Sequence, residues 1–212
     1  MEIFKAIQSY SGHPLTHQLI LSLLKDYKRP NDKIHSMLTS GIIETVKKGL
    51  YIAGPAVKAT KPAPFLLANH IMGPSYVSMD IALSYHGLIP ERVYEISSMT
   101  TKASRNFKTP VGFFSFTRLP LPYYSCGIQQ VRFSDDQYAM VASPEKALFD
   151  KVVATAGLIL RSKKSALSYL LEDLRLDEEN LKQLDITAMY EWQADAPKSE
   201  SLSMILNAIK TL

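Results

Sequence analysis

Apolar and polar positions near the N-terminal end of the chain follow first a helical and then a strand period. Apolar side chains recur every three or four positions in three short segments, which predict helices over residues 3–10, 14–27 and 31–40. Two β-branched runs, residues 42–46 and 50–52, predict the strands of a hairpin. Three helices followed by a hairpin are typical of a winged helix-turn-helix, which we place at residues 1–58.

Residues that start and stop helices support these boundaries. Gly12 follows the first helix, and Pro14 stands near the start of the second. Asn31 is suited to cap the third helix, which Gly41 ends. The hairpin turn is then formed by the Lys-Lys-Gly sequence of residues 47–49.

Residues 59–212 form a second and larger domain, which follows a Pro-, Ala- and Lys-rich linker at residues 54–64. Segments rich in Val, Phe, Tyr and Ile predict a central, mainly antiparallel sheet with strands at residues 93–99, 112–119, 127–133 and 137–142. Residues 76–78 are expected to be a short extended piece. Helical periods predict helices at residues 65–72, 80–86, 144–153, 163–174, 177–184, 188–194 and 199–212. The fold class is therefore α+β, with a winged helix-turn-helix, a central sheet and C-terminal helices.

Positive charge is concentrated at the N-terminal end, although the net charge of the whole chain is only +4. Residues 1–60 hold eight Lys/Arg and four Asp/Glu, residues 61–150 hold eight and seven, and residues 151–212 hold eight and nine. This asymmetry indicates that the N-terminal module meets a polyanion.

A winged helix-turn-helix places its third helix in the major groove of duplex DNA, and its turns and hairpin on the phosphates. We therefore expect Lys33, Ser36 and Thr39 to face the bases, with His35 as a further candidate on the same face. The expected backbone contacts are Lys28, Arg29, Asn31, Lys47 and Lys48. Duplex DNA is favoured over RNA because the module has few aromatic residues for stacking unpaired bases. A role as a protein-interaction module is the alternative.

Candidate chemistry is sparse along the chain, and we expect no catalytic residue, no metal and no cofactor. His13 and His17 have the spacing of a helical metal pair, but Pro14 places His13 outside the helix and no HExxH glutamate lies between them. Ser143 and Lys146 match the spacing of acyl-enzymes, yet a serine before a proline at a helix start already acts as a cap. The single cysteine, Cys126, favours a reducing compartment. An enzyme that acts on nucleic acid therefore remains the least favoured function.

The apolar runs are too short for export or membrane insertion. The longest, residues 152–160, is about half of what a bilayer-spanning helix needs. The start of the chain lacks the apolar core of a signal peptide. We expect a cytoplasmic protein with no membrane partner.

Several sequence blocks together resemble one known family. They are KKGLY at residues 47–51, YVS at 76–78, ALSYHGLIP at 82–90 and PEKALFD at 144–150. Their order over residues 1–155 resembles the AbiEi family of antitoxins of type IV toxin-antitoxin systems. The resemblance implies an N-terminal domain that represses its own operon by binding inverted repeats in double-stranded DNA. It also implies a C-terminal domain that counters a nucleotidyltransferase-like toxin without forming a stable complex with it.

The polar residues of these blocks have two possible roles. They are Tyr76, Ser78, His86, Glu145, Lys146 and Asp150. They form either a shared buried network or part of a binding surface of the antitoxin domain. The runner-up function is a winged-helix transcription factor whose larger domain senses a ligand or a protein and which has no toxin.

Overall fold

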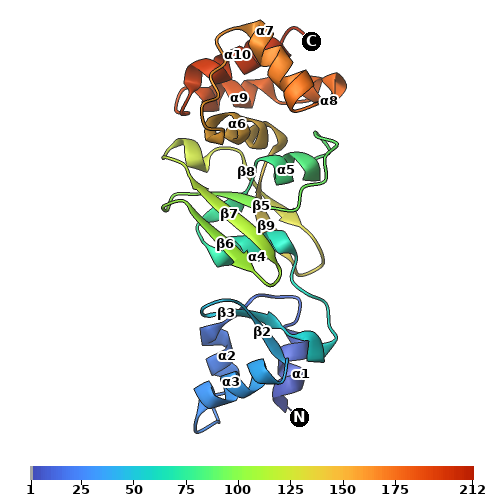
Figure 1. Cartoon of the computed structure of the whole chain (residues 1–212), viewed down its shortest axis with the longest axis vertical. Coiled ribbons are helices and arrows are strands. Elements are labelled where there is room, and N and C mark those ends of the chain that lie inside the picture. The colour runs from blue at the N-terminus through green and yellow to red at the C-terminus, as the bar shows by residue number, and fades with distance from the viewer. Residues whose placement is uncertain (1) are drawn as a thin grey trace.

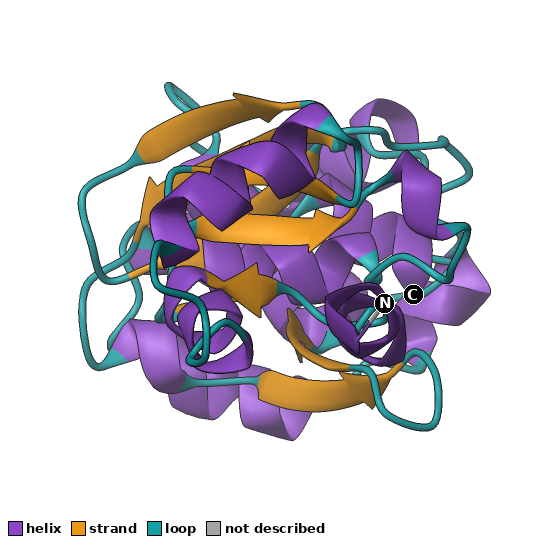
Figure 2. Cartoon of the chain, turned by 90° about the horizontal axis from the view of Figure 1, so that it is seen from below, coloured by secondary structure: helices purple, strands orange, loops and turns teal. Residues whose placement is uncertain are grey.

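The protein is built in three tiers along one long axis (Figure 1). The computed structural model describes residues 2–212, so residue 1 of the module expected at 1–58 lies outside the described residues. The lower tier holds the N-terminal helices and a small sheet, the middle tier a larger sheet, and the upper tier the C-terminal helices. In the view from below, the helices and strands of the three tiers overlap (Figure 2). The predicted α+β class is confirmed.

The lower tier contains three helices and a three-stranded antiparallel sheet of order β1-β3-β2. Its elements are α1 (Glu2–Ser9), β1 (Leu15–Thr16), α2 (His17–Leu23), α3 (Pro30–Thr39), β2 (Ile43–Lys47) and β3 (Leu50–Ala53). Each helix sends an apolar residue into one core, where Ile7, Ile20 and Met37 are fully buried. The apolar faces that the helical period gives these helices therefore form the core of this tier.

Two helix starts differ from the expectation. The second helix begins at His17, not near Pro14, because Leu15 and Thr16 pair with β3 as a short strand. Thr16 then caps α2 by accepting a hydrogen bond from the backbone N–H of Leu19 at 3.1 Å. The expectation that Asn31 caps α3 is wrong. Pro30 already occupies the first helical position, which suits a residue with fixed φ and no N–H, so Asn31 lies inside the first turn.

The middle tier is a six-stranded mixed sheet of order β6-β7-β5-β4-β9-β8. Its strands are β4 (Ser75–Val77), β5 (Ile96–Thr100), β6 (Arg105–Thr109), β7 (Gly112–Arg118), β8 (Ile128–Arg132) and β9 (Tyr138–Ala142). The neighbouring pairs β6/β7, β5/β4 and β9/β8 are antiparallel, whereas β7/β5 and β4/β9 are parallel. The sheet is thus mixed, with three antiparallel and two parallel pairs. Strand β4 largely coincides with the extended piece expected at residues 76–78, whereas β6 lies outside the expected segments.

Helices cover both faces of this sheet. α4 (Pro64–Ile71) lies on the side of the winged module, and α5 (Asp80–Tyr85) and α6 (Pro144–Ala154) lie on the side of the upper tier (Figure 1). Tyr76 in β4 and Ser78 just after it both reach α6, because side chains two positions apart point to the same side of an extended chain. Burial on both faces explains why all positions of β4 and β5 are buried.

The upper tier is a set of short helices packed above α6. They are α7 (Lys163–Ser168), a π-helical turn η3 (Tyr169–Asp173), α8 (Glu178–Lys182), α9 (Ile186–Gln193) and α10 (Ser199–Ile209). Short 3-10 turns also occur as η1 (Pro55–Val57) and η2 (Tyr123–Ser125). Among residues 2–212, no helix has the length and apolar character that crossing a membrane requires.

The strand β3 connects the lower and middle tiers. Tyr51 and Ala53 pack into the core of the N-terminal helices, whereas Leu50 and Ile52 pack into the core of the larger domain, together with Val46 of β2. The alternation of a β-strand therefore serves two cores at once. The hairpin of the winged module is docked onto the sheet domain as a consequence.

Candidate nucleic-acid interface

Helix α3 lies in the lower tier near the free end of the molecule (Figure 1), and its solvent-facing positions carry a stripe of polar side chains. Ile34 and Met37 are buried beneath the helix. Four of the exposed positions follow the spacing i, i+3, i+4, i+7 and form the stripe, namely Asp32, His35, Ser36 and Thr39. Two predicted base-facing residues, Ser36 and Thr39, therefore lie side by side on the outward face.

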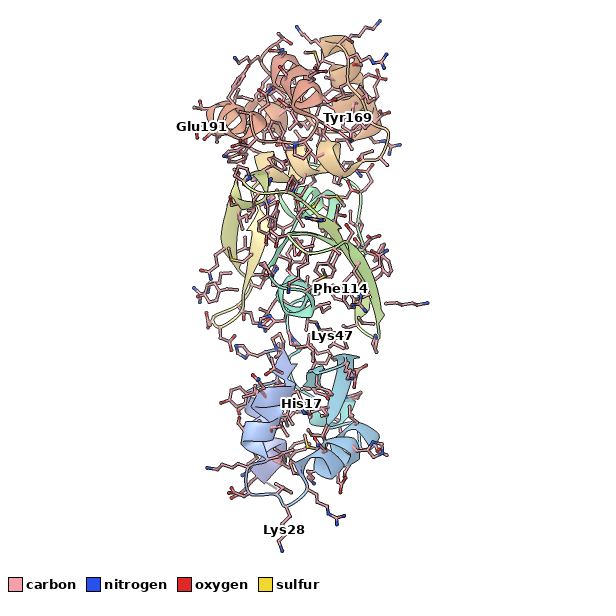
Figure 3. All side chains as sticks on the ribbon, turned by 90° about the vertical axis from the view of Figure 1, so that its left-hand side faces the viewer. His17, Lys28, Lys47, Phe114, Tyr169 and Glu191 are labelled. Carbon is pink, nitrogen blue, oxygen red and sulfur yellow. The ribbon has the colours of Figure 1, made fainter. Side chains whose placement is uncertain are left out.

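The turn between α2 and α3 adds positive charge to this end. Figure 3 shows Lys28 at the tip of the lower tier, pointing away from the rest of the protein. Arg29 is also exposed, and its guanidinium lies 3.8 Å from the Asp32 carboxylate. An exposed pair at this distance is weak, so Arg29 stays available to an external anion. Both cations stand beside the N-terminus of α3, whose free N–H groups also favour anions.

Lys33 and Asn31 lie at the sides of the stripe. The Lys33 ammonium is 5.7 Å from the centre of the Tyr27 ring, and the side chain is half-buried. Asp32, by contrast, stands in the middle of the outward face, although we did not expect it there. Its spacing of four from Ser36 and seven from Thr39 is the signal that would have identified it.

The two lysines of the hairpin have different environments. The Lys47 ammonium donates a hydrogen bond to the carbonyl oxygen of Ile71 and lies 5.9 Å from the centre of the Phe107 ring. Burial lowers the pKa of Lys47, and the neighbouring charges of Lys102 and Arg105 lower it further. Figure 3 shows Lys47 at the junction of the lower and middle tiers. Lys48 remains in the turn, on the outside of the hairpin.

The second predicted cluster forms a buried network centred on the Asp150 carboxylate. Its Oδ2 atom accepts hydrogen bonds from Tyr76 at 2.9 Å and Ser78 at 2.7 Å. Its Oδ1 atom accepts one from Tyr123 at 3.0 Å and lies 3.0 Å from the Lys146 ammonium. Four predicted residues are thus brought together, and Tyr123 completes the set.

The Lys146 ammonium is held on several sides. It donates to the carbonyl oxygen of Tyr123 at 2.9 Å and lies 3.1 Å from the centre of the ring of Tyr123. Burial lowers the pKa of Lys146, and Asp150 opposes that shift. Burial raises the pKa of Tyr76 and Tyr123, and the Asp150 charge raises both further. All members of the network are fully buried, so the arrangement fixes β4, η2 and α6 relative to one another.

His86 and Glu145 are not part of this network. They line a small cavity of about 170 Å³ together with residues of α8. The Nε2 atom of His86 lies 2.8 Å from the carbonyl oxygen of Ala142. A carboxylate oxygen of Glu145 accepts a hydrogen bond from the backbone N–H of Asp185 at 3.0 Å. His86 therefore connects the end of α5 to the backbone of β9, and Glu145 connects α6 to the backbone at the start of α9.

Comparison with known proteins identifies a shared fold. No family model matches the chain, and no curated protein matches it either. The fold resembles that of the RV2827C protein from Mycobacterium tuberculosis. The crystal structure of that protein superposes with a TM-score of 0.56 at 13% sequence identity, and the match covers 99% of this chain and 80% of the other.

The likeness to the RV2827C protein includes all three tiers, because it covers nearly the whole of this chain. It is therefore not a likeness of the winged module alone, which is a common unit. At this level of identity the comparison shows that the fold is shared, and the function has to be argued from the residues of this chain.

Proposed function

We propose that the protein binds duplex DNA through α3 and the turn before it, and that it represses transcription of its own operon. The observation that carries this proposal is the exposed stripe of α3 flanked by Lys28 and Arg29 at the free end of the molecule. Short polar side chains on a helix next to exposed cations fit a major groove bordered by phosphates.

Each residue of the stripe suits a distinct contact. The hydroxyl of Ser36 is free to donate or accept a hydrogen bond at a base edge. The hydroxyl of Thr39 donates to the carbonyl oxygen of His35 at 3.0 Å, which leaves its methyl group for a thymine methyl. The Asp32 carboxylate suits the amino group of a cytosine and disfavours a nearby phosphate. Lys28 and Arg29 supply affinity without base preference.

Docking of the hairpin on the larger domain removes one of its two lysines from the candidate phosphate contacts. Because the Lys47 ammonium already binds the carbonyl oxygen of Ile71, we assign Lys47 to the contact between domains. Lys48 stays a candidate phosphate contact, since it lies in the turn of the hairpin and has access to solvent.

The antitoxin role rests on the resemblance of the sequence blocks to the AbiEi family. On this proposal the larger domain counters a nucleotidyltransferase-like toxin encoded beside the gene. Co-expression with such a neighbouring toxin tests it: growth should be restored by the full chain and by a variant that no longer binds DNA. Failure of the full chain to restore growth would contradict the antitoxin role and would not affect the proposal that the protein is a repressor.

DNA binding is tested by fluorescence anisotropy with the duplex upstream of the gene and an unrelated duplex. The double variant Lys28→Ala/Arg29→Ala should bind both duplexes more weakly, and its salt slope should fall by about one for each phosphate that is no longer neutralised. The matched control is Lys163→Ala/Lys164→Ala, which removes the same charge from exposed positions at the start of α7 in the upper tier. Equal effects of the two double variants would contradict the assignment of the surface, and no preference for the upstream duplex would contradict the repressor.

A further inference from the structure

The two edges of the six-stranded sheet differ in charge. β6, at one end of the strand order, carries Arg105 and Lys108, and cations on an edge strand oppose the addition of a further strand. β8, at the other end, has the sequence IQQVR, in which Arg132 at the last position is the only charged residue. The Arg132 guanidinium is already paired with the Asp135 carboxylate of the following turn. β8 therefore lacks the protection that β6 has.

Hydrogen bonds at both ends of the β8/β9 pair show which backbone groups of β8 face β9. The N–H of Ser143 donates to the carbonyl oxygen of Gly127 at 2.8 Å, and the N–H of Phe133 donates to that of Gln137 at 2.8 Å. Both bonds continue the antiparallel register of the two strands, in which hydrogen-bonded and non-hydrogen-bonded pairs alternate. The odd-numbered residues of β8 therefore bond to β9.

The even-numbered residues of β8 turn their backbone groups outward. They are Ile128, Gln130 and Arg132, whose N–H and C=O groups point away from β9 at the open edge of the sheet. The side chains of Gln130 and Arg132 are exposed, so another chain has access to this edge. A row of free N–H and C=O groups without charge protection is a template for one more strand.

β8 is complementary to a second copy of itself. In antiparallel pairing centred on Gln130, the Gln130 residues of the two copies face each other, and Ile128 faces Arg132 of the second copy. The outward backbone groups of both strands then meet in hydrogen-bonded pairs. The two facing amides can hydrogen-bond, and the aliphatic stem of Arg132 covers Ile128, so no like charges are opposed. The same pairing at β6 would bring the cations of both copies together.

This pairing also determines where the winged modules lie. Antiparallel neighbours in one sheet are related by a two-fold axis perpendicular to that sheet. The winged module and α4 lie on one side of the sheet, and α6 and the upper tier lie on the other (Figure 1). Rotation about a perpendicular axis keeps each tier on its own side. Both α3 helices therefore lie on the same side of the joined sheet, as an inverted repeat requires.

From the open and uncharged edge, its self-complementarity and the placement of the winged modules, we infer that β8 pairs with β8 of a second copy of this chain. The protein is then a two-fold dimer with one sheet that continues through both copies. The inference rests on the geometry of the sheet and holds in the absence of DNA. It also supplies the two-fold symmetry that the proposed repressor needs.

Sedimentation velocity of the full chain without DNA, over a wide range of protein concentration, tests the inference. The unchanged protein should form dimers as its concentration rises. Gln130→Pro should weaken dimerisation by about tenfold or more, because one N–H donor in each copy is lost, whereas the ladder with β9 does not use that donor. Gln130→Lys should weaken it as well, since two ammonium groups would then face each other.

The matched control is Asn106→Lys, which makes the same change from a neutral amide to a cation at an exposed position of β6. This control should dimerise like the unchanged protein. Thermal melting verifies that each variant is folded. The inference is overturned if the unchanged protein stays monomeric at all concentrations, or if Gln130→Lys and Asn106→Lys have equal effects.

Disulfide trapping tests the register of the pairing. Paired Cα atoms of this type lie about 5.5 Å apart, within the range of a disulfide bond. In a Cys126→Ser background, which removes the single native cysteine, Gln130→Cys should give a covalent dimer under mild oxidation. Asn106→Cys in the same background should not. Covalent dimers of both variants to the same extent would contradict pairing through β8.

Discussion

The Lys47 ammonium, at the end of β2, donates its hydrogen bond to the carbonyl oxygen of Ile71, the last residue of α4. This contact joins the hairpin of the winged module to the helix that begins the larger domain. Val46, Leu50 and Ile52 add apolar contacts on the same side. The hairpin therefore has two roles, since it closes the core of the N-terminal helices and also anchors them to the sheet.

Replacing Lys47 by alanine should loosen the contact between the domains while leaving the proposed DNA surface intact. Limited proteolysis should then cut the linker of residues 58–63 several times faster, because local opening exposes it more often. The salt slope of DNA binding should stay unchanged. The matched control Lys48→Ala should show the reverse pattern, with normal proteolysis and a salt slope lower by up to about one. A lower salt slope of DNA binding for Lys47→Ala would contradict this assignment and would indicate that Lys47 contacts phosphates.

The outward face of α3 should set sequence preference. Ser36→Ala should change which base is favoured at one position, by about 1 to 3 kcal/mol in discrimination. Asp32→Ala should relax the preference at another position and strengthen binding to unrelated duplexes, because a negative charge near the phosphates is removed. Competition binding with single-base variants of the upstream duplex measures both effects. Equal losses on every duplex would show that these residues do not read bases.

Local signals predict the three helices and the hairpin of the N-terminal module, because each helix has an apolar face, but they misplace the start of the second helix and the cap of the third. They do not predict β6, whose residues Arg105–Thr109 include two cations and only one large apolar side chain. Such a strand lies at the edge of a sheet, where charge prevents pairing with other chains, and edge position is a property of the whole fold. Local signals do not predict the pairing of Leu15 and Thr16 with β3 either, because this pairing also depends on the whole fold.

The candidate sites show the same limit. Spacing places Ser36 and Thr39 on one face of a helix from sequence alone. It cannot bring Ile71 beside Lys47, since the two residues are 24 positions apart and meet only when the hairpin docks. Tyr123 is likewise not predictable as a partner of Asp150, because nothing near it in sequence marks it as part of the network.

Asp150 should be the residue of the buried network whose replacement costs the most stability. Asp150→Asn leaves the Lys146 ammonium buried without its counter-charge, which costs about 3 to 5 kcal/mol of unfolding free energy. Lys146→Met should cost less, because the carboxylate keeps its three hydroxyl donors. Urea unfolding followed by circular dichroism measures both values. A greater destabilisation by Lys146→Met would mean that the carboxylate is not the centre of the network.

The protein should lose stability as the pH rises above about 10. Unfolded tyrosines ionise near this pH, whereas the pKa values of Tyr76 and Tyr123 are raised in the folded protein. The unfolded state therefore releases protons that the folded state retains, and unfolding becomes more favourable. The lowered pKa values of Lys47, Lys146 and Lys198 act in the opposite direction as the pH rises to 10.5. They are three groups against four tyrosines with raised pKa values, which are Tyr76, Tyr123, Tyr124 and Tyr169.

Urea midpoints measured between about pH 9 and pH 11, on either side of the ordinary tyrosine pKa, test this prediction. Tyr76→Phe should show a shallower decline with pH than the unchanged protein, since one retained proton is gone. The control Tyr94→Phe should keep the full decline, because Tyr94 is 76% exposed. The same slope in both variants would contradict the assigned role of Tyr76.

Gly127 should tolerate no side chain, because it lies where the chain passes between α6 and α9. Its φ is +62°, and a Cβ atom there would lie 2.6 Å from the Cβ of Lys146 and 2.8 Å from the ring of Trp192. Gly127→Ala thus combines backbone strain of about 1 to 2 kcal/mol with overpacking of about 1 to 3 kcal/mol. Gly157→Ala is the matched control, since its φ is +72° and no atom would lie within 4 Å of its Cβ. Urea unfolding should show the greater destabilisation at Gly127, and equal effects would mean that α6 and α9 can move apart at little cost.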